Sequence, residues 1–435
     1  MSARETALCA LIACRKGGAW SNGVLKEYCE RDNLDRRESA LASRLCYGVL
    51  QNRAKLDFYL KQLLTGKLRD LHPAVHDILR LGLYQIYEMD RIPDSAAVNE
   101  SVVLAKKYCP KVRNSGGLVN AVLRNAVRTK GTLKAPESLS DRFSHPENLV
   151  MLLKSYVGED RLEAMLRANN EAAPTVIQVN TKLATSAAVL QSLEADGVSA
   201  ENHRWLQDCL VLRDTGNMEQ LEAFKKGWFY VQDAAARLSV LCAEIPLGAK
   251  VLDCCAAPGG KSFAALVAGA GSVISCDVHS HKLNLIKNSA NRLGFENITV
   301  IDQDGSVFNP TWAEQMDVVI ADVPCSGYGI IRKKPDIRYK DPDTMKELPA
   351  LQLAILCNQA RYVRPGGTLM YSTCTLVRRE NEGVVEKFLK QNPEFYLEAL
   401  RLPCVFPENQ SGMLALVPGE YDTDGFFICR LRRKV

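Results

Sequence analysis

The chain has 435 residues, of which 47% are hydrophobic, and 55 Lys and Arg residues against 50 Asp and Glu residues leave a net charge of +5. This length suits two to four domains, and the apolar fraction is that of a folded globular protein rather than a disordered one. No window of the sequence approaches the roughly 18 uninterrupted apolar residues that a membrane helix needs. We therefore expect a soluble cytoplasmic protein with no membrane partner.

Fifteen cysteines and six histidines are scattered along the chain, and no C-x-x-C pair occurs. This scatter argues against a zinc ribbon, a thioredoxin-like site or a disulfide framework. Most of the thiols are expected to be small buried hydrophobic groups in a reducing compartment, and no metal site is expected. Only a minority are candidates for chemistry.

Charge is distributed unevenly along the chain. Residues 1–134 carry 23 basic and 13 acidic residues, a net charge of +10, whereas the remainder carries 32 basic and 37 acidic residues. Either half of the stretch 101–134, taken alone, would be interpreted as a basic helix face exposed to solvent. The whole stretch contains no acidic residue, which favours binding to a polyanion such as nucleic acid. Its eight basic residues are Lys106, Lys107, Lys111, Arg113, Arg124, Arg128, Lys130 and Lys134.

Residues 1–134 are predicted to form an all-α bundle, because apolar residues recur at spacings of three and four. We expect Asp94 or Ser95 to cap the helix that follows Pro93. The segment 129–140, which contains Gly131 and Pro136, is expected to be a linker. The expected helices span 3–14, 41–63, 74–87, 95–107 and 117–127.

The remainder of the chain is predicted to form two α/β parts. Residues 144–228 are expected to be a small module with strands at 176–180 and 209–213 and a helix at 186–194. From 229 to 435, apolar strands alternate with helices, which predicts a mainly parallel, Rossmann-like sheet with helices on both faces and ligands at the carboxyl ends of its strands. Its expected strands are 250–254, 273–277, 298–301, 317–321, 368–371 and 425–431, and its expected helices are 282–293, 350–362 and 382–389.

The sharpest local feature is the run Val251-Leu-Asp-Cys-Cys-Ala-Ala-Pro-Gly-Gly-Lys-Ser262, which predicts a strand, a turn of small residues and a helix. The small residues let a ligand approach the backbone, and the amide groups at the helix start can bind an anion. A Walker A motif would need glycine at Cys255, and the dinucleotide fingerprint would need a third glycine at Ile274, so neither phosphate loop fits.

Three acids, Asp253, Asp277 and Asp304, follow successive expected strands. Asp277 is suited to accept both ribose hydroxyls, and Asp304 can accept a hydrogen bond from an adenine amino group. Each acid alone would be a turn or cap residue, but the ordered set favours a nucleoside that carries a carboxylate, S-adenosylmethionine. The expected cofactor site comprises Cys255, Ala256, Ala257, Pro258, Gly259, Gly260, Lys261, Asp277, Asp304 and Asp322.

The run from Asp253 to Lys261 resembles the first motif of the Nop2/Sun family of RNA cytosine-C5 methyltransferases. Two further runs, Asp322-Val-Pro-Cys-Ser-Gly327 and Tyr371-Ser-Thr-Cys-Thr375, support this resemblance. In the first part of the chain, Asn99-Glu100 together with Gly117-Leu-Val-Asn-Ala-Val-Leu-Arg124 resembles a NusB-like RNA-binding domain. A NusB-like domain joined through Tyr230-Val-Gln-Asp233 to this core is similar to the layout of the bacterial Sun/Fmu enzymes, which methylate small-subunit ribosomal RNA.

Carbon 5 of cytosine is a poor nucleophile, and addition of a thiolate to carbon 6 activates it. Cys325 and Cys374 both fit this chemistry, and spacing alone leaves their two roles open. The resemblance implies that Cys374 is the nucleophile and that Cys325 assists proton removal and product release. Asp322 is expected to bind the cytosine ring nitrogen or amino group, and Lys261 either the methionine carboxylate or the base.

Three further positions bear on RNA contacts. The basic run Ile331-Arg-Lys-Lys-Pro335 is expected to hold phosphates beside the catalytic pocket, with an exposed charged loop as the alternative. Asn148 stands where the family commonly has Trp, and Gln178 where it usually has Arg. Both departures lie in the small module and concern its RNA contacts, not the catalytic core.

The resemblance thus implies a monomer that uses S-adenosylmethionine to methylate carbon 5 of a specific cytosine in 16S ribosomal RNA through a covalent cysteine–C6 adduct. DNA is not an expected partner. Two alternatives stay open: the same chemistry on transfer RNA or on another ribosomal site, and a catalytically idle RNA-binding assembly or antitermination factor.

Overall fold

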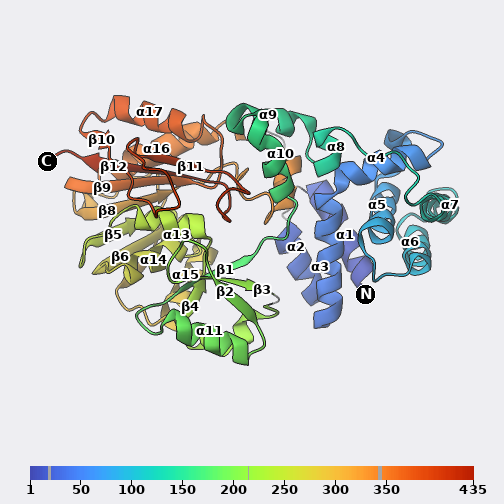
Figure 1. Ribbon diagram of the computed structural model, residues 1–435, viewed down its shortest axis with the longest axis horizontal. Coiled ribbons are helices and arrows are strands. Elements are labelled where there is room, and N and C mark those ends of the chain that lie inside the picture. The colour runs from blue at the N-terminus through green and yellow to red at the C-terminus, as the bar shows by residue number, and fades with distance from the viewer. Residues whose placement is uncertain (18–20, 214, 341–344) are drawn as a thin grey trace. The chain divides into compact units, whose positions relative to one another are not determined.

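The computed structural model describes residues 1–17, 21–213, 215–340 and 345–435. The chain divides into two compact units, a helical unit of residues 1–171 with 331–340 and a catalytic unit of residues 172–330 with 341–435. Figure 1 shows helices throughout the first and strands alternating with helices in the second. None of the helices in the described residues has the length and apolar character needed to cross a bilayer.

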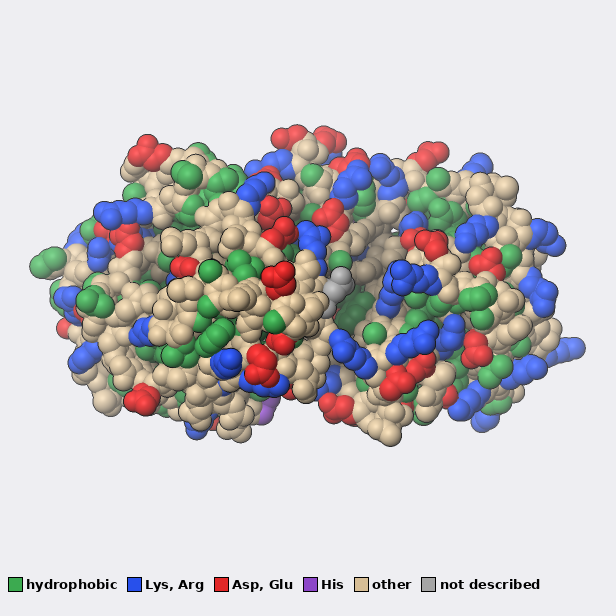
Figure 2. All heavy atoms as spheres, turned by 60° about the horizontal axis from the view of Figure 1, so that its bottom comes forward, with side chains coloured by type: hydrophobic (Ala, Val, Ile, Leu, Met, Phe, Trp, Pro, Cys, Tyr) green, Lys and Arg blue, Asp and Glu red, His purple; other side chains and the backbone are tan. Residues whose placement is uncertain are grey.

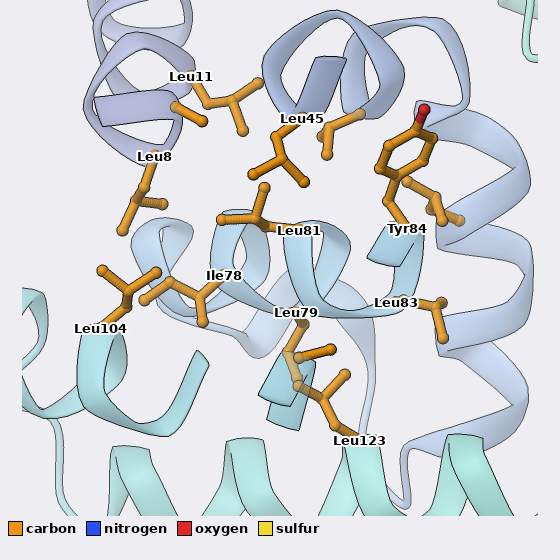
Figure 3. Packing of buried hydrophobic residues seen from close by; sticks show 14 of the residues in the cluster. Leu8, Leu11, Leu45, Ile78, Leu79, Leu81, Leu83, Tyr84, Leu104 and Leu123 are labelled. Atoms are coloured by element: carbon orange, nitrogen blue, oxygen red, sulfur yellow. The ribbon is translucent and has the colours of Figure 1, made fainter. Parts of the chain in front are cut away.

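The helical unit is built around α5, which is buried along almost its entire length. Apolar residues of the surrounding helices converge on it in one continuous core, where Leu79 is directed at Leu123 of α7 and Leu81 at Leu45 of α3 (Figure 3). The helices are α1 (Ala3–Gly17), α2 (Ser21–Arg31), α3 (Arg36–Gln51), α4 (Arg53–Leu63), α5 (Pro73–Glu88), α6 (Asp94–Tyr108) and α7 (Ser115–Arg128), with the short η1 (Leu68–Asp70) between α4 and α5.

Glycine allows α3 and α5 to approach each other closely. A Cβ atom on Gly48 would lie 2.0 Å from the ring of Tyr84, a distance that no side chain can tolerate. The Tyr84 ring therefore packs directly against the backbone of α3, and the core depends on the absence of a side chain at this position.

Two details of the predicted helices are wrong. The span 41–63 is not one helix, because α3 ends at Gln51 and α4 begins at Arg53, with Asn52 between them donating its side-chain amide to Gly48 O at 3.0 Å. The apolar periodicity continues across this break because both helices face the same core. At α6, Pro93 occupies the N-cap position without a side-chain cap bond, so neither Asp94 nor Ser95 is the cap.

Residues 139–168 also belong to the helical unit, as α8 (Leu139–Phe143), α9 (Glu147–Val157) and α10 (Glu159–Ala168). The first part of the expected small module, residues 144–171, is grouped with the helical bundle when the chain is divided into compact units. The segment 331–340, which includes η4 (Pro335–Tyr339), joins the same unit although it is distant in sequence.

The catalytic unit begins with a small antiparallel sheet of order β2-β3-β1-β4. Its strands are β1 (Thr175–Val179), β2 (Ser199–Asn202), β3 (Cys209–Arg213) and β4 (Phe229–Val231), with α11 (Ser186–Ala195), η2 (Met218–Gln220) and α12 (Glu222–Lys225) between them. Because β4 pairs with β1, this sheet extends to residue 231 rather than ending at the expected boundary of 228. The last strand of the small sheet thus leads directly into the catalytic core.

A second sheet of order β10-β12-β9-β8-β5-β6-β7 forms the catalytic core, with β11 paired to β12. The strands β5 to β9 are parallel, and β12 is antiparallel to β9, which confirms the mainly parallel Rossmann-like sheet. Its strands are β5 (Lys250–Asp253), β6 (Ser272–Asp277), β7 (Ile298–Asp302), β8 (Met316–Asp322), β9 (Val363–Thr373), β10 (Phe395–Leu397), β11 (Met413–Leu416) and β12 (Phe426–Arg433), with η3 (Pro310–Trp312) before β8.

Helices cover both faces of this sheet (Figure 1). One apolar cluster packs α13 (Ala234–Leu241), α14 (Gly260–Val267) and α15 (Ser280–Arg292) on one face. A second cluster packs α16 (Leu348–Ala360) and α17 (Glu382–Gln391) on the other. This two-layer covering places the carboxyl ends of the parallel strands at one open edge, where ligands bind in such sheets.

Candidate active site

The open edge of the catalytic sheet collects the residues that the motifs singled out. Asp277 ends β6, Asp322 ends β8, and Cys374 directly follows β9. The parallel register pairs Asp322 with Ser372, so the two cysteine-bearing loops leave the sheet side by side. The structure thus brings the predicted cofactor loop and the predicted catalytic residues to the same edge.

The expected cofactor loop is a tight turn between β5 and α14. The Ala256 N–H donates to Cys276 O at 2.8 Å, and the Ala257 N–H faces the Asp277 carboxylate at 3.3 Å. Gly259 has φ 109°, and a Cβ there would lie 2.5 Å from the Phe263 ring. The turn therefore requires glycine, and it brings the loop backbone against the carboxylate at the end of β6.

The three acids that follow β5, β6 and β7 have different surroundings. Asp253 is fully buried and accepts the Ser262 hydroxyl at 2.7 Å, and burial raises the pKa of its carboxyl to about 7. Asp277 is 7% exposed and accepts the His279 N–H at 3.0 Å. Asp304 is exposed and accepts the Ser306 N–H at 2.8 Å. Asp253 therefore anchors the start of α14, whereas Asp277 and Asp304 lie at the open edge.

Gln232 is a polar residue of this region that does not appear among the predicted site residues. Its side-chain Nε2 atom lies 3.3 Å from the position that a Cβ atom would take if Gly260, at the start of α14, carried a side chain. The residue is 7% exposed, and within the described parts of the chain neither its Oε1 nor its Nε2 atom has a hydrogen-bond partner. The run Tyr230-Val-Gln-Asp233 is the sequence signal that points to it.

Cys325 and Cys374 are partly buried, and their sulfur atoms lie 3.2 Å apart. Their loops are tied together next to the thiols, because the hydroxyls of Ser326 and Thr375 are 2.8 Å apart. The contact with Cys374 and burial, together with nearby negative charge, raise the pKa of the Cys325 thiol. The two thiols therefore lie in contact, in surroundings that disfavour ionisation of the Cys325 thiol.

Lys261 forms an ion pair with Asp322, whose other carboxylate oxygen accepts the Ser372 hydroxyl at 2.8 Å. Burial opposes the positive charge, but Asp322 outweighs it, and Cys374 adds to the effect, so the pKa of Lys261 is raised above its ordinary value. The lysine ammonium group also lies 5.3 Å from the centre of the Phe426 ring. The described partner of Lys261 is thus the carboxylate of Asp322 at the end of β8.

Gln178, Asn148 and the run 331–335, which the sequence relates to RNA contact, have different surroundings in the structure. Gln178 is 1% exposed and donates to Gln232 O at 3.1 Å, so it supports the backbone beside the cofactor loop rather than a surface. Asn148 is exposed on α9 of the helical unit. The run 331–335 belongs to the compact helical unit, with Ile331 and Pro335 buried and Lys333 and Lys334 exposed.

The basic stretch 101–134 lies on the surface of the helical unit, and all eight of its Lys and Arg residues are exposed. On the face drawn in Figure 2, lysine and arginine side chains are interspersed with acidic groups. Within the stretch, Lys107 pairs with Glu5 at 2.5 Å, whereas Arg124 and Arg128 hydrogen-bond to neutral asparagine side chains. The helical unit therefore offers an exposed positive surface along α6 and α7.

Family models match three successive parts of the chain. The NusB family matches residues 1–128, and an RsmF/B-like ferredoxin-like domain matches residues 145–219. The model described as 16S rRNA methyltransferase RsmB/F matches residues 244–432. These matches follow the order of helical bundle, small sheet and catalytic sheet along the chain.

Individual relatives extend over the full length. The chain is 37% identical to the probable ribosomal RNA small subunit methyltransferase B of Bacillus subtilis, with 100% of this chain and 99% of the relative covered. The solved structure of PH0851 superposes with a TM-score of 0.82 at 23% identity, covering 99% of both chains. NSun6 from Pyrococcus horikoshii, solved with SFG, has a TM-score of 0.58 at 20% identity and covers 66% of this chain and 98% of its own.

Proposed function

Because the chain belongs to the RsmB/F family of 16S rRNA methyltransferases, we propose that it methylates carbon 5 of a specific cytosine in 16S ribosomal RNA with S-adenosylmethionine. The observation that carries this proposal is the pair of thiols, Cys325 and Cys374, 3.2 Å apart at the sheet edge. A single nucleophile would suffice for addition to the base, whereas two adjacent thiols also provide for release of the product.

The residues around the cofactor loop fit S-adenosylmethionine, which supplies an electrophilic methyl group when bound. Gln232 has a buried side-chain amide next to Gly260 that lacks a hydrogen-bond partner among the described residues, and a polar cofactor group would satisfy it. Asp277 would accept the ribose hydroxyls, and the loop from Cys255 to Gly260, with Asp304, would complete the site. The NSun6 structure with SFG, an analogue of S-adenosylmethionine, supports this choice of cofactor.

The cysteine pair would perform the covalent steps. The Cys374 thiolate adds to carbon 6 of cytosine, and the electrons of the double bond make carbon 5 nucleophilic toward the methyl group. Carbon 5 then takes the methyl group from the sulfonium centre of the cofactor, which leaves as S-adenosylhomocysteine. A base next removes the carbon 5 proton, the electrons of that C–H bond restore the double bond, and the bond from sulfur to carbon 6 breaks, which frees Cys374. We infer from the family resemblance that Cys325 assists this release, and its contact with Cys374 supports that role.

Asp322 and Lys261 would stabilise the base during addition. Each oxygen of the Asp322 carboxylate has one described partner, Lys261 or Ser372, and a carboxylate retains further lone pairs for the cytosine ring nitrogen or amino group. The charge of Lys261 lies beside the centre where negative charge develops, in a site that is mostly shielded from water.

The exposed basic residues of the helical unit would bind the RNA backbone. Contacts of lysine and arginine with phosphates give affinity that falls steeply with salt and carries little base specificity. The catalytic unit would therefore select the cytosine, and the helical unit would contribute to holding the ribosomal RNA.

Covalent trapping and bisulfite sequencing test the proposed chemistry. We expect Cys374→Ser to abolish methyl transfer and the protein–RNA adduct, and Cys325→Ser to accumulate the adduct, since release is impaired. Cys404→Ser, which changes an exposed thiol outside the pair, serves as the matched control and should behave as wild type. An adduct that accumulates with Cys374→Ser would reverse the two roles.

The substrate is tested separately in a deletion strain. Loss of one 5-methylcytosine from 16S ribosomal RNA is the expected result. Loss from transfer RNA or from another ribosomal site instead would replace the proposed substrate, and no change in any RNA would overturn the enzymatic function in favour of an idle RNA-binding factor.

A further inference from the structure

A buried carboxylate, that of Glu380, lies against the loop that carries Cys325. The residue has no exposed surface, and its Oε2 atom accepts the Ser326 N–H at 2.9 Å. The same oxygen accepts Gln352 Nε2 at 3.0 Å, and Gln352 also donates to Pro324 O at 2.9 Å. Glu380 and Gln352 thus bind the residues immediately before and after Cys325.

Glu380 is at the same time fixed to the strand and loop of the other thiol. Its carbonyl oxygen accepts the hydroxyl of Tyr371 on β9, and its N–H donates to Val377 O at 2.8 Å. The Gly329 N–H in turn donates to Cys374 O at 2.9 Å. These bonds hold the Cys325 loop in register with the Cys374 loop, which is consistent with the short distance between the two sulfur atoms.

The charge of Glu380 is not balanced by a salt bridge. Across the described residues, no Lys, Arg or His forms an ion pair with it, and its Oε1 atom is buried without a hydrogen-bond partner. Burying an ionised carboxylate in this way costs free energy, as is common for groups that serve a functional site. Lys261, the ion-pair partner of Asp322, supplies a positive charge that interacts with both Asp322 and Cys374.

We propose that Glu380 is a positioning residue that keeps the hydrogen on Cys325, so that when the thiol pair releases one proton to solvent the negative charge resides on Cys374. The S–H group of Cys325 then donates to the Cys374 thiolate across the 3.2 Å contact. The location of the proton is a property of the free protein, and only its use in attack on cytosine rests on the proposed function.

The charged groups around the two thiols favour a hydrogen on Cys325 and the negative charge on Cys374. Cys325 faces Cys374, Glu380 and Asp322, each of which opposes ionisation of its thiol and raises its pKa. Cys374 instead interacts electrostatically with the ammonium group of Lys261, which is paired with Asp322. A negative neighbour disfavours a thiolate and a positive neighbour favours it, so the two sulfurs are made unequal although they are in contact.

Alkylation of the free, full-length protein tests the proposal. Glu380→Gln removes the charge but keeps a side-chain oxygen for the Ser326 N–H. Initial rates of iodoacetamide modification at Cys325, followed by peptide mass spectrometry as a function of pH, report its ionisation. We expect the midpoint to fall by about one pH unit, and the rate at a fixed lower pH to rise roughly tenfold.

Glu386→Gln, the same substitution at an exposed position of α17, is the matched control and should leave the Cys325 profile unchanged. A folded Glu380→Gln variant with the wild-type Cys325 profile overturns the proposal. In the methylation assay, Glu380→Gln should lower kcat while the KM values for RNA and cofactor stay within about twofold. The alkylation needs no RNA, so it remains decisive even where the proposed substrate is wrong.

A second variant decides the matter if Glu380→Gln fails to fold, as judged by its melting curve. Gln352→Met removes a donor from the Glu380 carboxylate and leaves the charge less shielded. The Cys325 alkylation midpoint should then move upward, opposite to the shift in Glu380→Gln. An unchanged or lower midpoint in this variant overturns the proposal.

Discussion

Arg338 offers the sharpest test of how the helical unit is held together. The side chain is 2% exposed, and its guanidinium group donates to Gln51 O at 2.9 Å and to Asn169 O at 2.8 Å, with Phe143 O and Ser144 O at 3.3 and 3.2 Å. These carbonyls lie at the C-terminal ends of α3, α8 and α10. A single cation thus binds three helix ends, where carbonyl oxygens lack partners and the helix dipole is negative.

The decrease in the free energy of unfolding that we expect for Arg338→Met follows from these contacts. The two shorter bonds are charge-assisted and contribute about 1.5 kcal/mol each to the free energy of unfolding, or about 3 kcal/mol together. Favourable interaction with three helix ends adds a further amount of about 1 kcal/mol. The cost of burying the charge offsets part of these two contributions, as shown by the pKa of Arg338, which burial lowers to about 10. We therefore expect a net destabilisation of roughly 2–4 kcal/mol, within the range for breaking buried charged networks.

Hydrogen–deuterium exchange is the suitable assay, because the chain has two compact units and this method reports on each of them, whereas one global midpoint would average over both. In Arg338→Met, peptides from the ends of α3, α8 and α10 should exchange faster, while peptides of the catalytic sheet should not change. Arg69→Met, at a highly exposed arginine of the same unit, is the matched control and should change stability by less than about 0.5 kcal/mol. Unchanged protection of the three helix ends in Arg338→Met would refute the reasoning.

Three further predictions concern the helical unit. Gly48→Ala forces a methyl group against the Tyr84 ring and should lower the free energy of unfolding by about 2 kcal/mol in urea titration, whereas an unchanged midpoint would contradict the packing. Burial alone would raise the pKa of Asp57, but His76 and Arg80 outweigh it and lower this pKa to about 2. Ionised Asp57 should therefore add roughly 2 kcal/mol to the free energy of unfolding above pH ~4, and this contribution should be lost as the pH falls toward 2. Asp57→Asn should remove this pH-dependent part of the stability, and an identical acid transition in the variant would exclude it. Neutralising four exposed basic residues, Lys111, Arg113, Arg124 and Arg128, should weaken RNA binding for all RNA sequences. The slope of log K against log salt concentration should fall by roughly 0.7–0.9 for each phosphate that the protein no longer neutralises. An unchanged slope would place the RNA elsewhere.

The sequence by itself determined the parts of this protein that depend on local pattern. Alternation of apolar strands and helices located the central parallel sheet, and small residues followed by lysine marked the turn between β5 and α14. The motifs around Cys325 and Cys374 indicated two thiols at adjacent strand ends, and the structure places their sulfur atoms 3.2 Å apart. These features are readable because a strand, a turn and a helix start each depend on residues that are neighbours in the chain.

Tertiary structure alone decided the features that depend on distant partners. The break at Asn52 was hidden because α3 and α4 direct their apolar residues at one core. Arg338 appears in the sequence as one more charge after a basic run, and its carbonyl partners lie as far away as Gln51. Glu380 reads as a surface residue before a helix until the fold brings Ser326 and Gln352 to it. A buried charge is defined by the groups packed around it, and chain folding, not sequence proximity, assembles those groups.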